Sequence, residues 1–436
     1  MTNNLKTRQH YLNKLIKYKD SEYVKIITGI KGVGKSSLLL LFKNYLLENN
    51  VSENNIIHID FKSEMYADIN SKDLLLTKFL SILEKNSDKK YLLLDEIEDI
   101  PSWDKVINGI LLDFNLDIYI TSNMYKLDVH SKLYLIQHRI HMSPLSFREF
   151  INFNDMEITK VNVDTVIGPS YSIKNSANEY QDLLSLYNTY LTIGGLPAIS
   201  DEFNNIEIVN KYIDKTINTI INDDIIGSID LEERDKYRDN NIFYEILKYL
   251  AARVGKRIHF SKLAKLLNSL RKDSEEEYDY VKVQSLIDIL RQKNIIYGIR
   301  KFDIKEKDYI FGYNRFCFTD IGILNSFLEN KNEHLDLILK NIVFLALKRK
   351  GYEVAFGKFK KLDVNFVVIK NFEELLYVQI TKNFIDSKSL NKDVKILKKI
   401  DDNYEKIILS NATPYRDNIS GIKLRNVLDW LLEIEN

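Results

Sequence analysis

Residues Val24 to Phe42 read VKIITGIKGVGKSSLLLLF. The segment Gly29-Ile30-Lys31-Gly32-Val33-Gly34-Lys35-Ser36 inside this stretch fits the pattern G-x-x-x-x-G-K-[ST]. A β-branched segment, residues 24–28, precedes it and an apolar segment, residues 36–47, follows it. This order predicts a strand, a glycine-rich loop and a helix, which is the context that a phosphate-binding loop requires.

Such a loop binds phosphate because its glycines let successive N–H groups point at the phosphate oxygens, and the helix N-terminus adds a positive dipole. We expect Lys35 to bridge the terminal phosphates of a nucleotide and Ser36 to hold Mg²⁺. The predicted nucleotide-binding residues are Gly29, Gly32, Val33, Gly34, Lys35, Ser36 and Ser37.

A phosphate-binding loop needs an acidic partner on a neighbouring strand. The segment Tyr91-Leu92-Leu93-Leu94-Asp95-Glu96 reads as a buried strand that ends in two carboxylates. We expect Asp95 to share the Mg²⁺ ion with Ser36, and Glu96 to deprotonate the attacking water. The two acids that follow, Glu98 and Asp99, are interpreted as solvated or capping residues.

A third polar strand end follows in LDIYITSN, residues 116–123, where Asn123 or Ser122 is the candidate contact to the γ-phosphate. Another strand is expected at residues 55–61, and helices at residues 71–85 and 103–114. Strands that alternate with helices predict an α/β fold with a parallel sheet covered by helices on both faces.

Four segments carry a resemblance to a known family: LDEIEDIPSWDKVI (94–107), ITSN (120–123), SPLSFREF (143–150) and YLTIGGLPAI (190–199). Together they resemble the archaeal-type, AAA-related ATPases of prokaryotes, which carry a winged helix and a C-terminal domain of restriction-endonuclease fold. The resemblance implies ATP hydrolysis with Mg²⁺, in which Lys35, Ser36, Asp95, Glu96 and Asn123 take the roles given above. It also makes Arg139 the nearest counterpart of an arginine finger. The chain departs from the family at Glu98, where glutamine is usual.

The resemblance and the residue patterns together predict four parts. We expect a P-loop ATPase core at 1–155, a helical lid or connector at 156–238, a winged helix at 239–328 and an inactive restriction-endonuclease-like domain at 329–436. Residues 152–176 are polar and irregular and read as a loop or a short insertion, whereas residues 177–224 have helical periodicity that is interrupted at Gly194-Gly195-Leu196-Pro197.

Three helical segments (242–255, 259–267 and 281–294) and two strands (295–304 and 308–318) form the predicted winged helix. Its second helix and its wing are rich in basic residues, which would suit contact with the phosphates of double-stranded DNA. Winged helices also bind proteins, and both interpretations stay open. The basic residues are Lys262, Lys265, Arg271, Lys272, Arg300, Lys301, Lys305 and Lys307.

The last hundred residues predict a helix (335–351), three strands (353–359, 362–370 and 375–381), a helix (390–400), a strand (406–410) and a closing helix (421–435). This order of elements resembles the restriction-endonuclease fold. A nuclease of that fold needs carboxylates on the second and third strands, with a lysine beside them to orient water. This chain has Lys340 on the first helix, Asn365 on the second strand and Gln379-Ile380-Thr381 on the third. Asp363 alone is a poor substitute, so we predict no cleavage.

Composition limits the partners. The 436 residues contain 62 basic and 62 acidic side chains and one cysteine, Cys317, so no internal disulfide forms and no global field attracts nucleic acid or membrane. We expect a cytoplasmic protein with no membrane partner. A homo-oligomer or a protein partner remains open. The leading interpretation is an ATPase that couples its nucleotide state to a partner. The alternatives are a nucleotide-sensing interaction switch with little turnover and an ATP-dependent nuclease.

Overall fold

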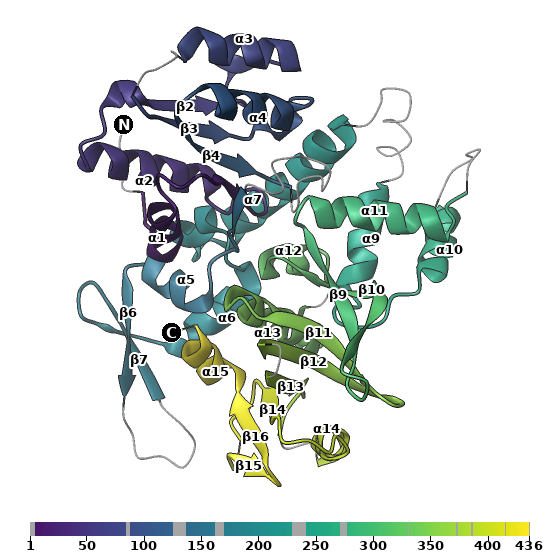
Figure 1. The fold of residues 1–436 in the computed structure, drawn as a ribbon. Helices are drawn as coiled ribbons and strands as arrows, with labels where there is room; N and C mark the ends of the chain where they lie inside the picture. Colours follow the sequence, from purple (N-terminus) through teal and green to yellow (C-terminus); the bar gives the residue numbers. More distant parts are fainter. Residues whose placement is uncertain are drawn as a thin grey trace. The chain divides into compact units, whose positions relative to one another are not determined.

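The computed structural model of the chain is shown in Figure 1. The chain divides into two compact units, one formed by Met1–Ser143 with Gln292–Asn294 and the other by Pro144–Arg291 with Ile295–Asn436. The structure describes residues 5–83, 88–124, 137–161, 170–228, 241–270, 277–329, 331–371, 374–384, 387–414 and 416–435.

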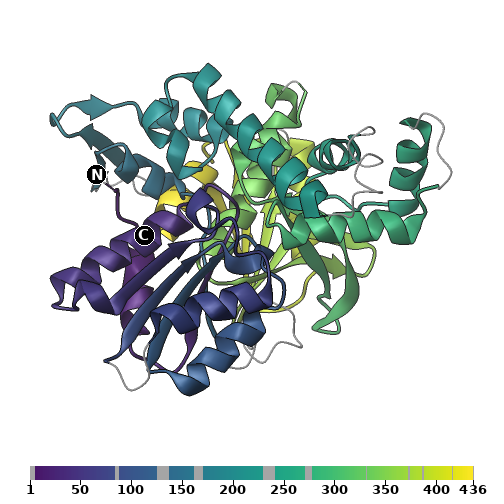
Figure 2. The same ribbon diagram turned by 90° about the horizontal axis from the view of Figure 1, so that it is seen from above.

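The first unit is built on a parallel five-stranded sheet in the order β2-β3-β4-β1-β5. Figure 2 shows strands of this sheet, in purple and blue, between helices. This arrangement confirms the predicted α/β class and places β4 between the strand before the P-loop and the acidic strand. The strands are β1 (Val24–Thr28), β2 (Ile56–Asp60), β3 (Lys90–Asp95), β4 (Leu116–Ser122) and β5 (Gln137–His141), and the helices are α1 (Gln9–Lys17), α2 (Lys35–Glu48), α3 (Lys72–Ile82) and α4 (Trp103–Asp113).

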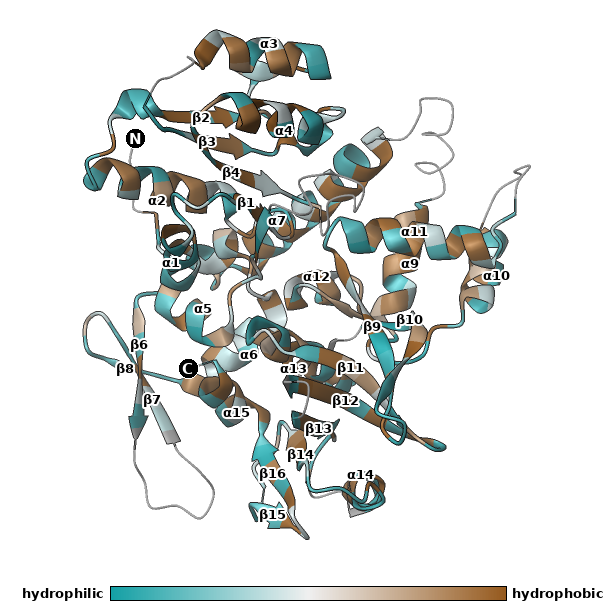
Figure 3. Ribbon diagram, in the orientation of Figure 1, coloured by the Kyte–Doolittle hydropathy of each residue, from teal (hydrophilic) through white to brown (hydrophobic). Residues whose placement is uncertain are grey.

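Helices cover both faces of this sheet because successive side chains of a strand point to opposite sides. On β4, Ile118 and Ile120 belong to the core that α3 and α4 complete, including Phe79 and Ile107. Tyr119 lies between them in sequence and meets Phe42 of α2, with ring centroids 4.4 Å apart. Apolar residues dominate β2 and β3, which are brown in Figure 3. Such near-continuous apolar strands are typical of a sheet that is buried on both faces.

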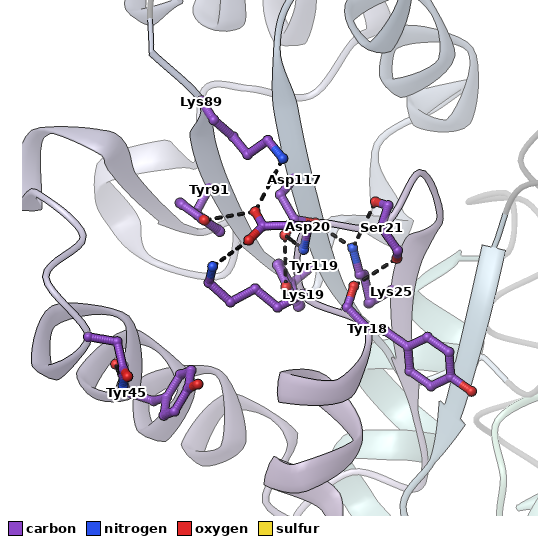
Figure 4. Close-up of polar contacts among 11 residues, drawn as sticks. Tyr18, Lys19, Asp20, Ser21, Lys25, Tyr45, Lys89, Tyr91, Asp117 and Tyr119 are labelled. Atoms are coloured by element: carbon purple, nitrogen blue, oxygen red, sulfur yellow. Dashed lines mark hydrogen bonds and ion pairs between the residues drawn. The ribbon is translucent and has the colours of Figure 1, made fainter.

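A buried ion pair links the amino-terminal ends of β1 and β4 (Figure 4). The Lys25 Nζ atom donates to Asp117 Oδ1, and the two side chains are 0% and 1% exposed. Asp117 Oδ2 accepts from the Tyr119 hydroxyl at 3.0 Å and from the backbone N–H of Asp20 at 2.8 Å. Burial lowers the pKa of Lys25, and Asp117 opposes that shift. The pair joins the loop before β1 to β4.

The second unit begins with α5 (Phe147–Phe153) and an antiparallel three-stranded sheet. The sheet comprises β6 (Met156–Val161), β7 (Ser170–Asn175) and β8 (Tyr180–Gln181). The expectation of a loop at residues 152–176 is therefore wrong over β6 and β7. Its residues are mostly polar and pair through their backbones, with Ile173 buried as the apolar anchor. Polarity alone does not distinguish such a sheet from a loop.

The glycine break in the helical segment is confirmed. The helix α6 (Leu183–Ile193) ends at Gly194, whose φ of +82° is a left-handed conformation that glycine adopts freely. The neighbouring Gly195 donates its N–H to Asp320 Oδ2 at 2.8 Å, and its carbonyl oxygen accepts from the backbone N–H of Leu145 at 2.7 Å. Two of the segments that carry the family resemblance, 143–150 and 190–199, are thus hydrogen-bonded to each other in the second unit.

The remaining elements of this region follow the predicted order. Short helices are Pro197–Glu202, Ile226–Ser228 and, in π conformation, Thr219–Ile225. The longer elements are α7 (Ile206–Asn218), α9 (Ile242–Ala251), α10 (Phe260–Leu270), α11 (Tyr280–Gln292), β9 (Ile296–Asp303), β10 (Asp308–Phe318) and α12 (Ile321–Ser326).

One eight-stranded sheet joins the hairpin β9–β10 to the C-terminal strands, in the order β10-β9-β11-β12-β13-β14-β16-β15. Its β9 runs parallel to β11, with Lys301 opposite Phe356. The hairpin that we predicted as the wing is therefore hydrogen-bonded on both sides of β9. The C-terminal elements are α13 (Leu335–Arg349), β11 (Glu353–Phe359), β12 (Leu362–Asn371), β13 (Glu374–Ile380), α14 (Ser387–Lys398), β14 (Glu405–Ser410), β15 (Asn418–Ile419), β16 (Ile422–Asn426) and α15 (Val427–Ile434).

The predicted closing helix at 421–435 is wrong in its first half. Ile422 and Leu424 are buried and Lys423 between them is exposed, which is the alternation of a strand. The helix α15 begins after Asn426, whose side chain accepts from the backbone N–H of Leu428. Among the described residues, none of the helices combines the length and the apolarity that crossing a lipid bilayer takes.

Candidate nucleotide site

The P-loop occupies the turn between β1, which ends at Thr28, and α2, which begins at Lys35. Gly34 caps the helix at a φ of +93°, a conformation that side chains with a Cβ rarely adopt. A Cβ at Gly29 would clash with the backbone carbonyl oxygen of Met142, so this position needs glycine for a close approach of two backbones. No side chain caps the N-terminus of α2 and its first turn carries no acid. Its N–H groups are therefore suited to an anion.

The Lys35 side chain folds back over the loop and is 3% exposed. Its ammonium donates to the carbonyl oxygens of Gly29 at 3.0 Å and Ile30 at 3.2 Å, and to Asn123 Oδ1 at 2.8 Å. Burial lowers the pKa of Lys35, and the carboxylates of Glu96, Glu98 and Asp95 oppose this shift. A phosphate would offer this ammonium a charged acceptor in place of neutral ones.

The acidic strand brings Asp95 to the same end of the sheet. Its carboxylate is buried and accepts hydrogen bonds from the hydroxyls of Thr121 and Ser36, which oppose the rise that burial imposes on the pKa of Asp95. Ser36 is exposed, so its hydroxyl is open to a ligand. A carboxylate next to a hydroxyl at the mouth of a phosphate loop fits the oxygen ligands that Mg²⁺ takes.

Glu96 directly follows the strand in a left-handed conformation, with φ at +54°. Its backbone N–H donates to Thr121 Oγ1 at 3.0 Å, which fixes the turn. A residue other than glycine in this region is strained, and such strain gathers at functional sites. The half-buried Glu96 side chain is thereby held at the carboxyl end of β3, beside Asp95.

The interpretation of Glu98 as solvated or capping is wrong. Glu98 lies in the short helix η3 (Ile97–Asp99), and its Oε1 atom accepts from the backbone N–H of Asn123 at 2.7 Å. Although the residue as a whole is half-buried, its Oε2 atom is buried and has no partner among the described residues. Burial raises the pKa of Glu98 to about 7. Asp99 is exposed and pairs with Lys62, as expected of a solvated acid.

Asn123, rather than Ser122, is the strand-end residue that contacts the P-loop lysine. The Ser122 hydroxyl accepts from the backbone N–H of Met124 at 3.0 Å instead. Among the other predicted residues, Val33 is fully buried and Ser37 is half-buried in the first turn of α2. Arg139 lies inside β5 opposite Ile26, two residues before the strand ends, and its Nη2 atom donates to Gln137 Oε1 at 3.3 Å.

Two N-terminal residues that sequence reasoning missed support the wall of the site. Arg8 Nη1 donates to the Ser143 carbonyl oxygen at 2.6 Å, and the Ser143 N–H donates to the Tyr11 hydroxyl at 3.0 Å. These bonds hold the segment after β5, which Gly29 approaches closely through Met142. An arginine and a tyrosine in a polar segment give no sequence signal that they will bind the backbone of Ser143.

The basic residues of the predicted winged helix have mixed surroundings. Lys262 and Lys265 are exposed on α10, whereas Arg271 and Lys272 lie outside the described residues. Arg300 pairs with Glu353 and Lys305 with Glu306. The Lys307 ammonium lies 3.4 Å from the Tyr404 hydroxyl, and Lys301 is half-buried in β9.

In the C-terminal sheet, two amide side chains bond across the neighbouring strands β12 and β13. Asn365 Oδ1 accepts from the Ile380 N–H at 2.8 Å, and Gln379 Oε1 accepts from the Asn365 N–H at 2.7 Å. These reciprocal bonds tie β12 to β13. The Lys340 Nζ atom lies 3.4 Å from Asp336 Oδ2. The Asp363 carboxylate forms ion pairs with Arg315 and Lys358.

Comparison with known proteins gives two family matches. The sequence model of a family described as an AAA domain matches residues 21–151. A second family, described as a domain of unknown function, matches residues 184–334. The parallel sheet of the first unit thus resembles the core of AAA-type P-loop domains.

The relatives cover most of the chain. An uncharacterized protein of Haemophilus influenzae is 27% identical over 430 residues, which span 98% of each chain. One from Methanocaldococcus jannaschii is 25% identical over 415 residues, or 89% of this chain and 85% of its own.

Among solved structures, the Walker-type ATPase of Pyrococcus abyssi matches with a TM-score of 0.45 and 16% identity, over 74% of this chain and 95% of its own. The Orc1 protein of Aeropyrum pernix, solved in complex with DNA, matches with a TM-score of 0.33 and 11% identity, over 76% and 95%. Likenesses this distant support no functional argument.

Proposed function

We propose that the protein binds ATP with Mg²⁺ and hydrolyses it. The observation that carries the proposal is the convergence on one uncapped helix N-terminus of the Lys35 ammonium, the Asn123 amide and the Asp95 carboxylate with its Ser36 hydroxyl. Sequence motifs place these residues on separate strands and a loop, and their meeting at one end of the sheet is what nucleotide binding requires.

Each residue has a stated task in this reaction. The N–H groups of the loop and Lys35 hold the phosphates, and Asp95 and Ser36 would hold a Mg²⁺ ion that neutralises phosphate charge. Glu96 accepts a proton from the water whose oxygen attacks the γ-phosphorus. The bond from that phosphorus to the bridging oxygen breaks, and ADP and phosphate leave. Asn123 contacts the γ-phosphate, and Arg139 stays a proposed arginine finger.

Two substitutions test the assignment. Glu96→Gln should bind a fluorescent ATP analogue like the parent but release phosphate about 10²- to 10⁴-fold more slowly, because an amide cannot accept the proton. Lys35→Ala should lose binding itself. Asp99→Asn is the matched control, since Asp99 is an exposed acid of the same turn. Parent-like turnover in Glu96→Gln would refute the assigned base, and a parent that binds without turnover would favour the nucleotide-sensing switch.

We also propose that the nucleotide state is coupled to a partner. Within the first unit, the Asn294 side chain is 1% exposed, and its Nδ2 atom donates to the backbone carbonyl oxygen of Asn123 at 2.6 Å. Asn294 lies in the chain between α11 and β9. A shift of Asn123 on phosphate contact would therefore move Asn294 and, through the chain, the predicted winged helix. The partner is either double-stranded DNA or a protein, and the ATPase rate with and without duplex DNA distinguishes them.

The C-terminal domain is proposed to lack nuclease activity. Neutral amides are poor ligands for a hard divalent cation, and here those of Asn365 and Gln379 are occupied by cross-strand hydrogen bonds. Incubation of plasmid DNA with the protein and Mg²⁺ or Mn²⁺ should leave the DNA intact. Cleavage that disappears in Asp363→Ala would contradict this and favour the ATP-dependent nuclease.

A further inference from the structure

The helix α14 lies in the second unit (Figure 1). A row of lysines follows one side of this helix and ends at the residue directly after it. The spacing of these residues is four, three and four, which on a helix places them within a stripe about 60° wide and about 16 Å long. All of them are exposed, and together they line one side of a groove of about 490 Å³. They are Lys388, Lys392, Lys395 and Lys399.

Leu362, the first residue of β12, lines the groove together with Asn391 and Ile396 of α14. Two more exposed lysines, Lys360 and Lys361, directly precede Leu362 in the turn from β11 to β12. Among the described residues that line the groove, none is acidic and none is aromatic. In a chain with equal numbers of basic and acidic residues, this is a local concentration of positive charge.

The acid within α14 does not offset the row. The acidic residue of α14 is Asp393, and its side chain is directed to the sheet, where its Oδ1 atom accepts from Gln379 Nε2 at 3.2 Å. Like charges three or four residues apart destabilise a helix by about 0.2–0.5 kcal/mol per pair. The apolar side of α14 is not open to a ligand, because Leu390, Val394 and Leu397 are buried in the core. The row thus lies on the exposed side of α14, away from the core.

We propose that this lysine groove binds the sugar–phosphate backbone of duplex nucleic acid. Ammonium groups are point charges without the fork of arginine, so they suit phosphates rather than base edges. Single-strand sites stack bases on aromatic side chains, which this groove lacks among its described residues. Membrane binding would need exposed apolar residues, and those of α14 are buried. Binding is therefore independent of sequence and sensitive to salt.

This inference names a surface for the nucleic-acid partner of the proposed function, and it rests on that part of it. It assigns the contact to α14, not to the second helix and wing that the sequence indicated. The ATP site can be correct while the groove fails, and the reverse also holds.

The test is a titration of the full-length protein into a fluorescently labelled 30-bp DNA duplex of arbitrary sequence. The fluorescence anisotropy of the label reports binding at several salt concentrations. Lys392→Gln with Lys395→Gln should lower the slope of log affinity against log salt by about 1.8, at about 0.9 per lost phosphate contact. Two single variants, Lys395→Gln and its matched control Lys398→Gln, are compared in the same assay. Both residues are exposed on α14, but only Lys395 lines the groove. Lys398→Gln should leave the slope unchanged.

Several outcomes would overturn the groove. They are no affinity of the parent for the duplex at low salt, an unchanged slope in the double variant, or an equal loss in Lys398→Gln. A slope lost only in Lys262→Gln with Lys265→Gln would assign DNA to the predicted winged helix instead. Polyglutamate that binds where the duplex does not would indicate an acidic protein partner. Phosphate release without DNA, measured on the same samples, reports separately on the ATPase proposal.

Discussion

Replacing Glu98 with glutamine should remove a pH dependence from the stability of the first unit. Burial raises the pKa of Glu98 from 4.5 to about 7. Between these values the folded protein keeps a proton that the unfolded chain releases, so the free energy of unfolding falls as the pH rises. The whole gap is worth about 3 kcal/mol, and about 2 kcal/mol of it falls between about pH 5.5 and about pH 8.

Fluorescence can report this loss for the first unit alone. The chain has two tryptophans, and Trp103 is in the core of that unit at 7% exposure. In a Trp430→Phe background, Trp103 is the sole tryptophan, and urea titrations at the two pH values give its unfolding free energy. The parent should lose about 2 kcal/mol more than Glu98→Gln between them.

The comparison cancels groups that both proteins share. Burial also raises the pKa of Asp95, but Asp95 is present in each variant. The control is Asp99→Asn, which removes an exposed acid of the same turn and should behave like the parent. An equal loss of stability in the parent and in Glu98→Gln would refute the buried, protonated state of this carboxyl group.

Two further predictions concern stability in the first unit. Asp117→Ala should cost about 3–5 kcal/mol in urea unfolding, because it leaves the ammonium of Lys25 buried without a counter-charge; Asp113→Ala, at an exposed site, should stay within about 0.5 kcal/mol, and a similar small cost for both would contradict the argument. Gly29→Ala should lower nucleotide affinity and cost about 1–3 kcal/mol, because its Cβ would clash with the Met142 carbonyl oxygen. Gly109→Ala in α4, where no atom lies within 4 Å of the added Cβ, should be neutral or stabilising, and equal effects at the two glycines would show that the close approach is unimportant.

Local patterns predicted the regular elements well. The strands β1 to β4 and the helices α2 to α4 lie within a few residues of their expected positions. The break at Gly194 was also predictable, because a left-handed φ is a property of one residue. Predictions failed where a segment takes its structure from pairing with other strands rather than from its own residue pattern. The polar strands β6 and β7 read as a loop, and β16 read as helix because its alternation is only five residues long.

The structure brings several residues of the predicted site together through contacts that the sequence did not indicate. Lys35 and Asn123 are 88 positions apart and meet only because β4 is inserted between β1 and β3. The burial of Glu98 was missed, since DEIED reads as a solvated acidic segment until the Asn123 backbone is known to lie against it. The hairpin β9–β10 was predicted, but its pairing with β11 was not.

The sequence by itself determined the phosphate loop, the acid that ends β3 with the acid that follows it, and the amides of the C-terminal strands, because each is a matter of residue type at a fixed local spacing. The tertiary structure alone decided which strand end meets Lys35, that Glu98 is shielded from water, and that Leu362 forms a groove with the lysine row of α14. The physical reason is that these depend on strand order and on burial. Both arise from contacts between residues far apart in the chain, about which local periodicity carries no information.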